Sequence, residues 1–373
     1  MLYQNRTIAQ TLLSVAALLT VLSPGVANAA DVAPVPVKAS PAPDVPFFLV
    51  NDNRLTYSYQ FTATDPGAFS TRPDGTINGK TAKQVYSFTH FDVWTYGTNF
   101  FNIDMLKSDH NDPASPCSPA GVLPFGPQGI CAGVTEFYGI ERSTFGWNEI
   151  FNTTAFKVGP LKNISFEVGV DLGTANSYFA PTTNNVVGGL QFAFDLPYKG
   201  YVNVAPLVVA GLASHKSFLQ CGLFNPGNPG VTCLLDGNRR FPPTWKVETN
   251  YYMDLGFLPE SIRYFAISGR VSVTGAKGDI NTLPALSGVG RFSNASKIEL
   301  NSEPIRLTFD AGKAFIGPKY SHYVDLWVAY RYWQNKYGLD SNATPGTCTV
   351  AATGVSTNSC TEKSASAGVS VKF

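Results

Sequence analysis

A strict alternation of apolar and polar residues runs through the C-terminal stretch Lys363 to Phe373. Ala365, Ala367, Val369, Val371 and Phe373 share one parity, and mostly small polar residues share the other. Successive side chains of a β-strand point to opposite faces, so the pattern predicts a strand with one apolar and one polar face. Such a strand suits a barrel that meets lipid outside and a wet lumen inside. An edge strand of a soluble sandwich would show the same local pattern.

The same period of two recurs in eleven earlier segments, which makes the soluble alternative less attractive. Most of them exceed the roughly 9–11 residues that a tilted transmembrane strand needs. In one segment the apolar parity changes near Pro304, which predicts a β-bulge there. The predicted strands before the last are Asn53–Thr64, Lys83–Tyr96, Phe100–Ser108, Gly133–Ser143, Asn163–Thr174, Asn185–Leu196, Tyr201–Ala213, Thr244–Phe257, Ile262–Gly275, Ser296–Gly312 and Ser321–Asn335.

The connections between these segments alternate between long and tight, except for an irregular stretch after Ser143 that we expect to hold one helical turn near Trp147. An even strand number with long loops on one side is the pattern of bacterial outer-membrane barrels. The sequence therefore predicts an all-β fold, a transmembrane antiparallel up-and-down β-barrel of twelve strands. The predicted extracellular loops are Asp65–Ala82, Asp109–Ala132, Ala175–Asn184, Ser214–Pro243, Ala276–Ala295 and Lys336–Glu362.

The N-terminal part of the chain has the features of a secretory signal. Residues 1–29 hold one charge, Arg6, a short apolar run and the small-residue cleavage site Ala27-Asn28-Ala29. Residues 30–50 are rich in Pro and Ala, which is typical of an extended periplasmic tail. Residues 51–373 then form the barrel domain. We expect the protein in the outer membrane of a Gram-negative bacterium, in contact with its lipid.

Composition and motifs exclude several other classes. Charged residues are 14% of the chain and aromatic residues 13%, which fits an apolar outer surface. Removal of the signal takes away Arg6 and leaves equal numbers of basic and acidic residues, which disfavours nucleic-acid binding. No phosphate loop, nucleophile elbow or metal spacing occurs, and Ser321 and His322 alternate to opposite faces. We expect no catalytic residue, cofactor or metal.

Six cysteines fall in three of the long loops, two in each. An even number of cysteines confined in this way in a secreted chain favours disulfides over a zinc site. Because each pair lies within one loop, we expect the bridges to stiffen the loops over the pore mouth. The predicted bridges are Cys117–Cys131, Cys221–Cys233 and Cys348–Cys360.

Two stretches resemble the nucleoside-specific channel-forming porins, the Tsx-type family. One is the hairpin His90 to Asp104, with its His-x-Asp strand and Asn-Phe-Phe return, and the other is Tyr330 to Gly338. The resemblance implies a monomeric twelve-stranded barrel whose narrow channel is lined by aromatic and ionisable residues and binds nucleosides weakly. The C-terminal Phe373 is the expected contact for the barrel-assembly machinery.

The residues themselves also predict a lumen that could hold a small aromatic and polar solute. A nucleoside needs a flat apolar face for its base and hydrogen-bonding groups for its sugar. We place the ionisable parity of the first predicted hairpin strand in the lumen, because charges in lipid cost several kcal/mol. The predicted substrate-binding residues are Phe88, His90, Asp92 and Trp94 on one strand, and Asp325, Trp327, Arg331 and Trp333 on another.

Four further ionisable residues are expected to point inward, Glu136, Arg142, Glu167 and Asp171. Lumen charges can also simply pair with one another and hold water, as in any small barrel. The function expected from the sequence is passive, substrate-selective diffusion of nucleosides or similar solutes across the outer membrane. A general diffusion porin and a non-conducting structural or adhesin-like barrel are the alternatives.

Overall fold

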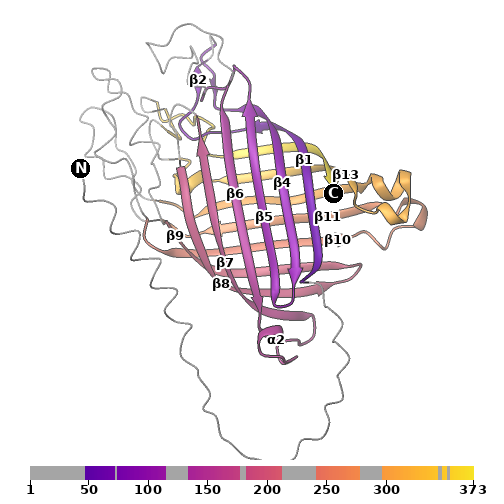
Figure 1. Cartoon of the computed structure of the whole chain (residues 1–373). Helices are drawn as coiled ribbons and strands as arrows, with labels where there is room; N and C mark the ends of the chain where they lie inside the picture. Colours follow the sequence, from indigo (N-terminus) through magenta and orange to yellow (C-terminus); the bar gives the residue numbers. More distant parts are fainter. Residues whose placement is uncertain are drawn as a thin grey trace, which may run out of the picture. The chain divides into compact units, whose positions relative to one another are not determined.

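The computed structural model describes residues 47–71, 74–114, 133–176, 182–211, 241–277, 296–342, 347–350 and 353–373. Within them, twelve long antiparallel strands form a closed barrel in which each strand pairs with its neighbours in the chain and β14 pairs with β1 (Figure 1). The predicted twelve-stranded up-and-down barrel is confirmed. The strands are β1 Phe48–Ala63, β4 Thr81–Trp94, β5 Gly97–Ser108, β6 Thr135–Gly146, β7 Leu161–Ala175, β8 Thr182–Leu196, β9 Gly200–Gly211, β10 Thr244–Asp254, β11 Phe265–Thr274, β12 Glu299–Asp310, β13 Val324–Gln334 and β14 Glu362–Lys372.

The remaining described elements are short. A two-stranded ribbon, β2 Ser70–Thr71 and β3 Ile77–Asn78, lies in the first long loop. The helical pieces are α2 Trp147–Ile150, η1 Glu260–Ile262, η2 Gly312–Ile316, η3 Pro318–Tyr320 and η4 Lys336–Gly338. The single helical turn expected near Trp147 is therefore present as α2. None of the helices in the described ranges is long and apolar enough to cross a membrane.

Two details of the strands can be compared with the sequence prediction. The register between β12 and β13 shifts between Ser302 and Ile305, so the bulge predicted near Pro304 is confirmed. It returns Ile305 to the outward parity, where it pairs with Tyr330. The first strand begins at Phe48, five residues before the predicted Asn53, and so includes the end of the segment assigned to the tail. The reason is that Phe48 and Val50 pair with the end of β4.

The polarity of the barrel is the reverse of that of a soluble protein. Leu55, Phe61 and Val328 are exposed by 57%, 52% and 55% on the outer face. Lys83 and Glu362, by contrast, are 2% exposed and point inward. A closed barrel leaves no unpaired strand edge, which is the condition for placing a sheet in hydrocarbon. The described barrel is thus built to lie in lipid.

We predict that Val328→Arg lowers the free energy of unfolding by about 2–4 kcal/mol, the cost of a cation on the lipid face near the midplane. Val328→Leu keeps an apolar side chain at this outward position and should remain near the wild type. Urea titrations of the protein refolded into lipid vesicles would measure both. An arginine variant as stable as the leucine variant would contradict the outward placement of Val328.

Candidate functional site in the barrel lumen

The four site residues predicted on β13 all point into the lumen. Asp325, Trp327, Arg331 and Trp333 lie on the inward parity, whereas Leu326 and Val328 between them are exposed on the outer face. Every one of the four contacts a charged or polar group of the lumen wall. Asp325 accepts a hydrogen bond from Arg54 Nη1 at 2.8 Å, and Arg331 Nε lies 3.1 Å from Glu362 Oε1.

The four site residues predicted on β4 point the other way, so that their assignment to the lumen was wrong. Phe88 pairs with the outward Leu55, and His90, Asp92 and Trp94 follow on the same parity. The inward parity of β4 belongs to Lys83 and the odd-numbered residues after it. The lumen had been inferred because two ionisable groups are costly in lipid. His90 Nε2 and Asp92 Oδ2 lie 2.9 Å apart, and this pairing lowers that cost.

The two tryptophans of β13 are covered by cations. The Arg306 guanidinium lies 4.0 Å from the centre of the Trp327 ring, and Trp327 Nε1 donates to Ser370 Oγ at 3.1 Å. Trp333 has Arg331 at 4.9 Å and Lys336 at 4.4 Å from its ring centre. Cation–π contacts of this kind fix the rings in place. The β13 wall is therefore both aromatic and cationic.

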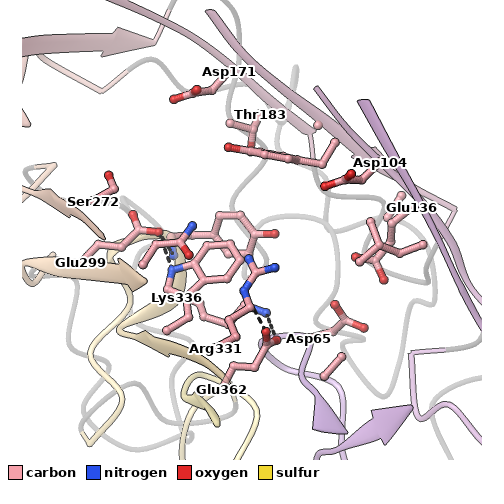
Figure 2. A pocket seen from close by; sticks show the side chains of 18 of the residues that line it. Asp65, Asp104, Glu136, Asp171, Thr183, Ser272, Glu299, Arg331, Lys336 and Glu362 are labelled. Atoms are coloured by element: carbon pink, nitrogen blue, oxygen red, sulfur yellow. Dashed lines mark hydrogen bonds and ion pairs between the residues drawn. The ribbon is translucent and has the colours of Figure 1, made fainter. Parts of the chain in front are cut away.

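A cavity occupies the extracellular half of the lumen, with about 1420 Å³ of empty space counting the open solvent at its mouth. Figure 2 shows Asp104, Glu136 and Asp171 on one wall and Glu299, Arg331 and Lys336 on the wall that faces it. Most of these charges are paired locally. Lys83 Nζ bridges Asp65 at 3.0 Å and Glu136, Lys277 bonds Glu299 at 2.8 Å, and Lys336 bonds Glu362 at 2.9 Å.

A second group of paired charges links three strands of the lumen wall. Arg142 on β6 donates to Asp171 on β7 at 2.7 Å and to both oxygens of Glu248 on β10, at 2.9 and 2.8 Å. Lys246 bonds the same two carboxylates at 3.0 and 2.6 Å. Glu167 accepts from Gln191 at 2.7 Å. The inward orientation predicted for Glu136, Arg142, Glu167 and Asp171 is confirmed.

Arg270 on β11 differs from these charges. It is exposed to the lumen, where it pairs in register with the inward Asn250 and Glu303, and no hydrogen bond or ion pair holds its guanidinium in the described part of the barrel. Asp104 lines the same cavity from β5, six strands away around the twelve-stranded barrel and so on the opposite wall. The Asp104 carboxylate accepts a hydrogen bond from Asn102 Nδ2 at 2.8 Å. The sequence indicated that Arg270 points inward, but not that it has no partner.

The periplasmic end of the lumen holds a turn organised by carboxylates. Asp310 accepts from Ser321 Oγ at 2.6 Å and from the His322 backbone N–H at 2.9 Å, and His322 Nδ1 lies 3.0 Å from Asp325 Oδ1. The strand alternation expected for Ser321 and His322 does not extend to this turn. The strand begins only at Val324, and His322 lies in a turn with a φ of 61°, where strand alternation does not apply.

Possible metal ligands gather in this turn. One ligand atom each of Asp310, His322 and Asp325 falls within 4.8 Å of the others. Both carboxylates already accept hydrogen bonds, Asp310 from the turn and Asp325 from Arg54, so these contacts account for the cluster. The hydrogen bond to Asp325 raises the pKa of His322, against the opposing effect of burial.

A disulfide joins Cys348 and Cys360 in the last long loop. Its sulfur atoms pack with the buried Leu339, and the neighbouring Ser359 Oγ accepts a hydrogen bond from the Gly67 backbone N–H at 3.0 Å. The bridge therefore holds this loop against the first one. Cys117, Cys131, Cys221 and Cys233 lie outside the described residues, and their pairing stays a prediction.

We predict a pH-dependent stability contribution from His322. Its pKa is raised on folding from an ordinary value of 6.5, so its stabilising effect is complete below that pH and is lost as the pH rises through the folded-state pKa. Substitution by asparagine, which tolerates a positive φ, removes the titrating group. The difference in unfolding free energy between wild type and His322→Asn should be larger at about pH 5 than at about pH 9.

The same comparison for His110→Asn, at an exposed loop histidine, is measured in parallel as the control. If the difference in unfolding free energy between wild type and His322→Asn stays constant across this pH range, or grows with pH, the stabilising role of protonated His322 is contradicted.

Comparisons with known proteins add little to this geometry. No protein-family model matches the sequence, and no curated protein is significantly similar. Among solved structures, the NanC porin has 8% identity and a TM-score of 0.42, covering 86% of this chain and 100% of its own. OccAB3 of Acinetobacter baumannii has 10% identity and a TM-score of 0.33, covering 87% and 99%. OprB of Pseudomonas putida has 9% identity and a TM-score of 0.32, covering 87% and 94%.

At these TM-scores the similarities carry no argument, and the assignment of this protein rests on the barrel itself. Within the described residues the sheet has no free edge, because β14 closes on β1. The outer face is apolar, and the interior carries paired charges around a cavity. Of the two architectures that can span a bilayer, this is the closed barrel of the outer membrane. The chain is therefore a multi-pass β-barrel protein of a Gram-negative outer membrane.

Proposed function

We propose that this barrel is a passive, substrate-selective channel for small solutes that combine a flat ring with hydrogen-bonding groups, as nucleosides do. The observation that carries the proposal is the guanidinium of Arg270 on the lumen wall, which has no hydrogen-bond or ion-pair partner among the described residues. A guanidinium presents five N–H donors in a fixed plane. Among the paired charges of the described lumen, it is a group that can bond a passing solute without first breaking an ion pair.

The surroundings of Arg270 favour a neutral polar solute over an anion. Asp104 lines the cavity from the opposite wall, and Glu303 pairs with Arg270 in register. Arg306 Nη2 already neutralises Glu303 at 2.8 Å. Carbonyl and hydroxyl oxygens of the solute can accept hydrogen bonds from the Arg270 guanidinium. Hydroxyl and amino groups of the solute can donate hydrogen bonds to the Asp104 carboxylate.

The β13 wall supplies the apolar contact for a ring. Trp333 lines the cavity, and its indole nitrogen donates to Glu299 Oε1 at 2.8 Å, which fixes the orientation of the ring. Trp327 is buried beneath Arg306, so the contact available to a base is the part of the Trp333 ring that Arg331 and Lys336 leave uncovered. Asp325 and Arg331 were predicted to bind the substrate, and because ion pairs already engage both, the role that we propose for them is electrostatic.

Weak binding is what a conducting pore requires, because a tight site would not release its solute. A hydrogen bond exchanged between water and protein contributes only about 1 kcal/mol, so a few such contacts give affinities in the micromolar to millimolar range. Diffusion through a barrel also needs no bound nucleotide or metal. Contacts of this strength favour one class of solute and still allow each molecule to leave the channel.

The test is a planar-bilayer recording of the purified protein with nucleosides, free ribose and a ring-free polyol. We expect an open-channel current that nucleosides reduce reversibly, with weaker reduction by ribose and none by the polyol. Current that flows without any solute-specific reduction would favour a general diffusion porin. Absence of current would favour a structural or adhesin-like barrel.

We predict that Arg270→Gln weakens the reduction of current by nucleosides by about tenfold, which is about 1.4 kcal/mol and near the usual value of a hydrogen bond to a charged group. Loss of a lumen cation should also shift the reversal potential in a salt gradient toward cation selectivity. Arg263→Gln removes the same charge from an exposed position that follows η1, and it should change neither property. Equal effects of the two variants would refute the role of Arg270.

A further inference from the structure

The connection between β12 and β13 forms a small helical projection at the periplasmic end of the barrel. It consists of η2 and η3, and in Figure 1 these orange turns extend beyond the ends of the neighbouring strands. We call the segment Gly312–Tyr320 the periplasmic knob. Phe315 and Ile316 in the knob are exposed by 79% and 60%. Two adjacent large apolar side chains exposed to this degree indicate a contact surface.

The knob folds against the lipid-facing side of the barrel. The Phe315 ring centre lies 5.9 Å from that of Phe309, which lies 6.2 Å from that of Tyr264. Phe309 is on the outward parity of β12 and pairs in register with the exposed Leu326. The apolar side of the knob therefore continues the lipid-facing belt at the level of the strand ends. This level is the boundary between hydrocarbon and headgroups, where aromatic residues of such barrels gather.

Basic groups lie beside these rings. Lys313 Nζ donates a hydrogen bond to the backbone carbonyl oxygen of Arg263 at 2.8 Å and lies 5.6 Å from the centre of the Tyr264 ring. This contact ties the knob to the connection between β10 and β11. Arg263 Nε donates to the Leu258 carbonyl oxygen at 3.0 Å, which orients the guanidinium. In the described part of the chain, no hydrogen bond or ion pair engages the two terminal nitrogens of that guanidinium.

The shape of the knob keeps a third basic residue nearby. Gly312 packs so closely on the Tyr320 carbonyl that a Cβ atom at Gly312 would lie 2.1 Å from the carbonyl oxygen. The knob thus doubles back on itself at these two residues. Lys313 directly follows the first of them, and Lys319 directly precedes the second. Both ammonium groups therefore belong to one compact turn.

The charges of the two connections do not balance. Arg263, Lys313 and Lys319 are basic, whereas Glu260 is the one acid between β10 and β11, and none lies between β12 and β13. Asp310, the last residue of β12, is 2% exposed and faces the lumen. The outer side of the knob therefore carries an excess of positive charge next to apolar rings. A ligand that matches both features is an anion with apolar chains.

An anionic phospholipid has this combination of groups. The periplasmic leaflet of a Gram-negative outer membrane consists of phospholipid, so this ligand is present at the level of the knob. Basic residues near a membrane surface attract anionic headgroups, and a guanidinium can bond two phosphate oxygens at once. Acyl chains, in turn, cover exposed apolar side chains at the boundary of the hydrocarbon.

We propose that the periplasmic knob and Arg263 form a binding site for an anionic phospholipid of the periplasmic leaflet. Arg263, Lys313 and Lys319 hold the phosphate, and an acyl chain lies on Phe315 and Phe309. The site is on the outside of the barrel and is independent of which solute passes through the lumen.

The first test is native mass spectrometry of the protein in a nonionic detergent, titrated with phosphatidylglycerol or phosphatidylcholine. We expect the wild type to retain phosphatidylglycerol preferentially. Lys313→Gln/Lys319→Gln should need about thirtyfold more of it for half-occupancy, the usual effect of two basic residues beside an anionic surface. Lys157→Gln/Lys199→Gln is the matched control, because it removes two exposed lysines from other periplasmic connections, and it should bind like the wild type.

Lys313→Arg/Lys319→Arg keeps both charges and should also bind like the wild type, which separates loss of charge from a change in the shape of the knob. Equal retention of the two lipids by the wild type, or an equal loss in the control pair, would overturn the proposal. Soluble glycerol phosphate should not displace the lipid. Displacement by it would show a phosphate site that does not recognise lipid, and would also overturn the proposal.

The second test replaces Phe315 by the photoreactive p-benzoylphenylalanine and identifies its adducts in native outer membranes by mass spectrometry. We expect phospholipid adducts in which anionic headgroups exceed their share of the membrane severalfold. Phe151 is the control position, because it is 57% exposed and follows α2, six strands away around the barrel. Adducts there should follow the composition of the membrane. Adducts of the same composition at both positions, an adduct with a protein at Phe315, or no lipid adduct there would overturn the proposal.

Discussion

Closure of β1 on β14 is the constraint on which the rest of the molecule depends. Hydrocarbon offers no partner to a backbone N–H or C=O, so a sheet in lipid must pair every strand on both sides. Seven residue pairs of β1 and β14, from Arg54–Lys372 to Gln60–Ser366, complete the ring. Once it is closed, the register fixes which parity of each strand faces inward, because paired residues of neighbouring strands point to the same side. Lumen and lipid faces are thus decided together around the whole barrel.

This constraint explains why the sequence predicted one half of the candidate site and missed the other. On β13 the inward Asp325, Trp327 and Arg331 alternate with Leu326 and Val328, so the lipid face is evident from the strand alone. On β4 both parities mix aromatic and polar residues, and no local rule decides between them. The decision comes from neighbours: Lys83 is drawn inward by Asp65 and Glu136, and every following residue takes its face from that one.

Other differences between prediction and structure have the same origin, since alternation predicts orientation only inside a strand. His322 precedes β13 in a turn, and the turn directs its ring toward Asp325 in place of lipid. Phe48 lies before the first alternating run, yet pairing with β4 recruits it into β1. For Arg270 the inward direction followed from alternation. Arg270 has no ion-pair partner in the described part of the chain because Arg306 pairs with Glu303, a contact that no pattern in the sequence discloses.

The paired charges of the lumen have a double effect. Buried ions are costly unless they are paired, and the pairs Arg142–Glu248 and Lys246–Asp171 connect β6 and β7 to β10 across the interior. These cross-links fix the shape of the channel and leave few groups free for solutes. A wall saturated with internal pairs cannot hold a solute tightly, which matches the fast release that conduction requires. In the function that we propose, selectivity depends on groups such as Arg270 and Asp104, which remain outside the ion pairs of the described lumen.

The period of two makes each strand serve two surfaces at once. Arg142 and Glu141 are neighbours in β6, yet one organises the lumen cluster and the other lies on the outer face. On β5, Asp104 and Phe101 are three residues apart and likewise face the lumen and the outside, respectively. The outer face of these strands therefore shares its backbone with the wall that opposes Arg270 inside. Because strands in a closed barrel cannot move independently of their neighbours, rigidity gained at one of these surfaces is conferred on the other.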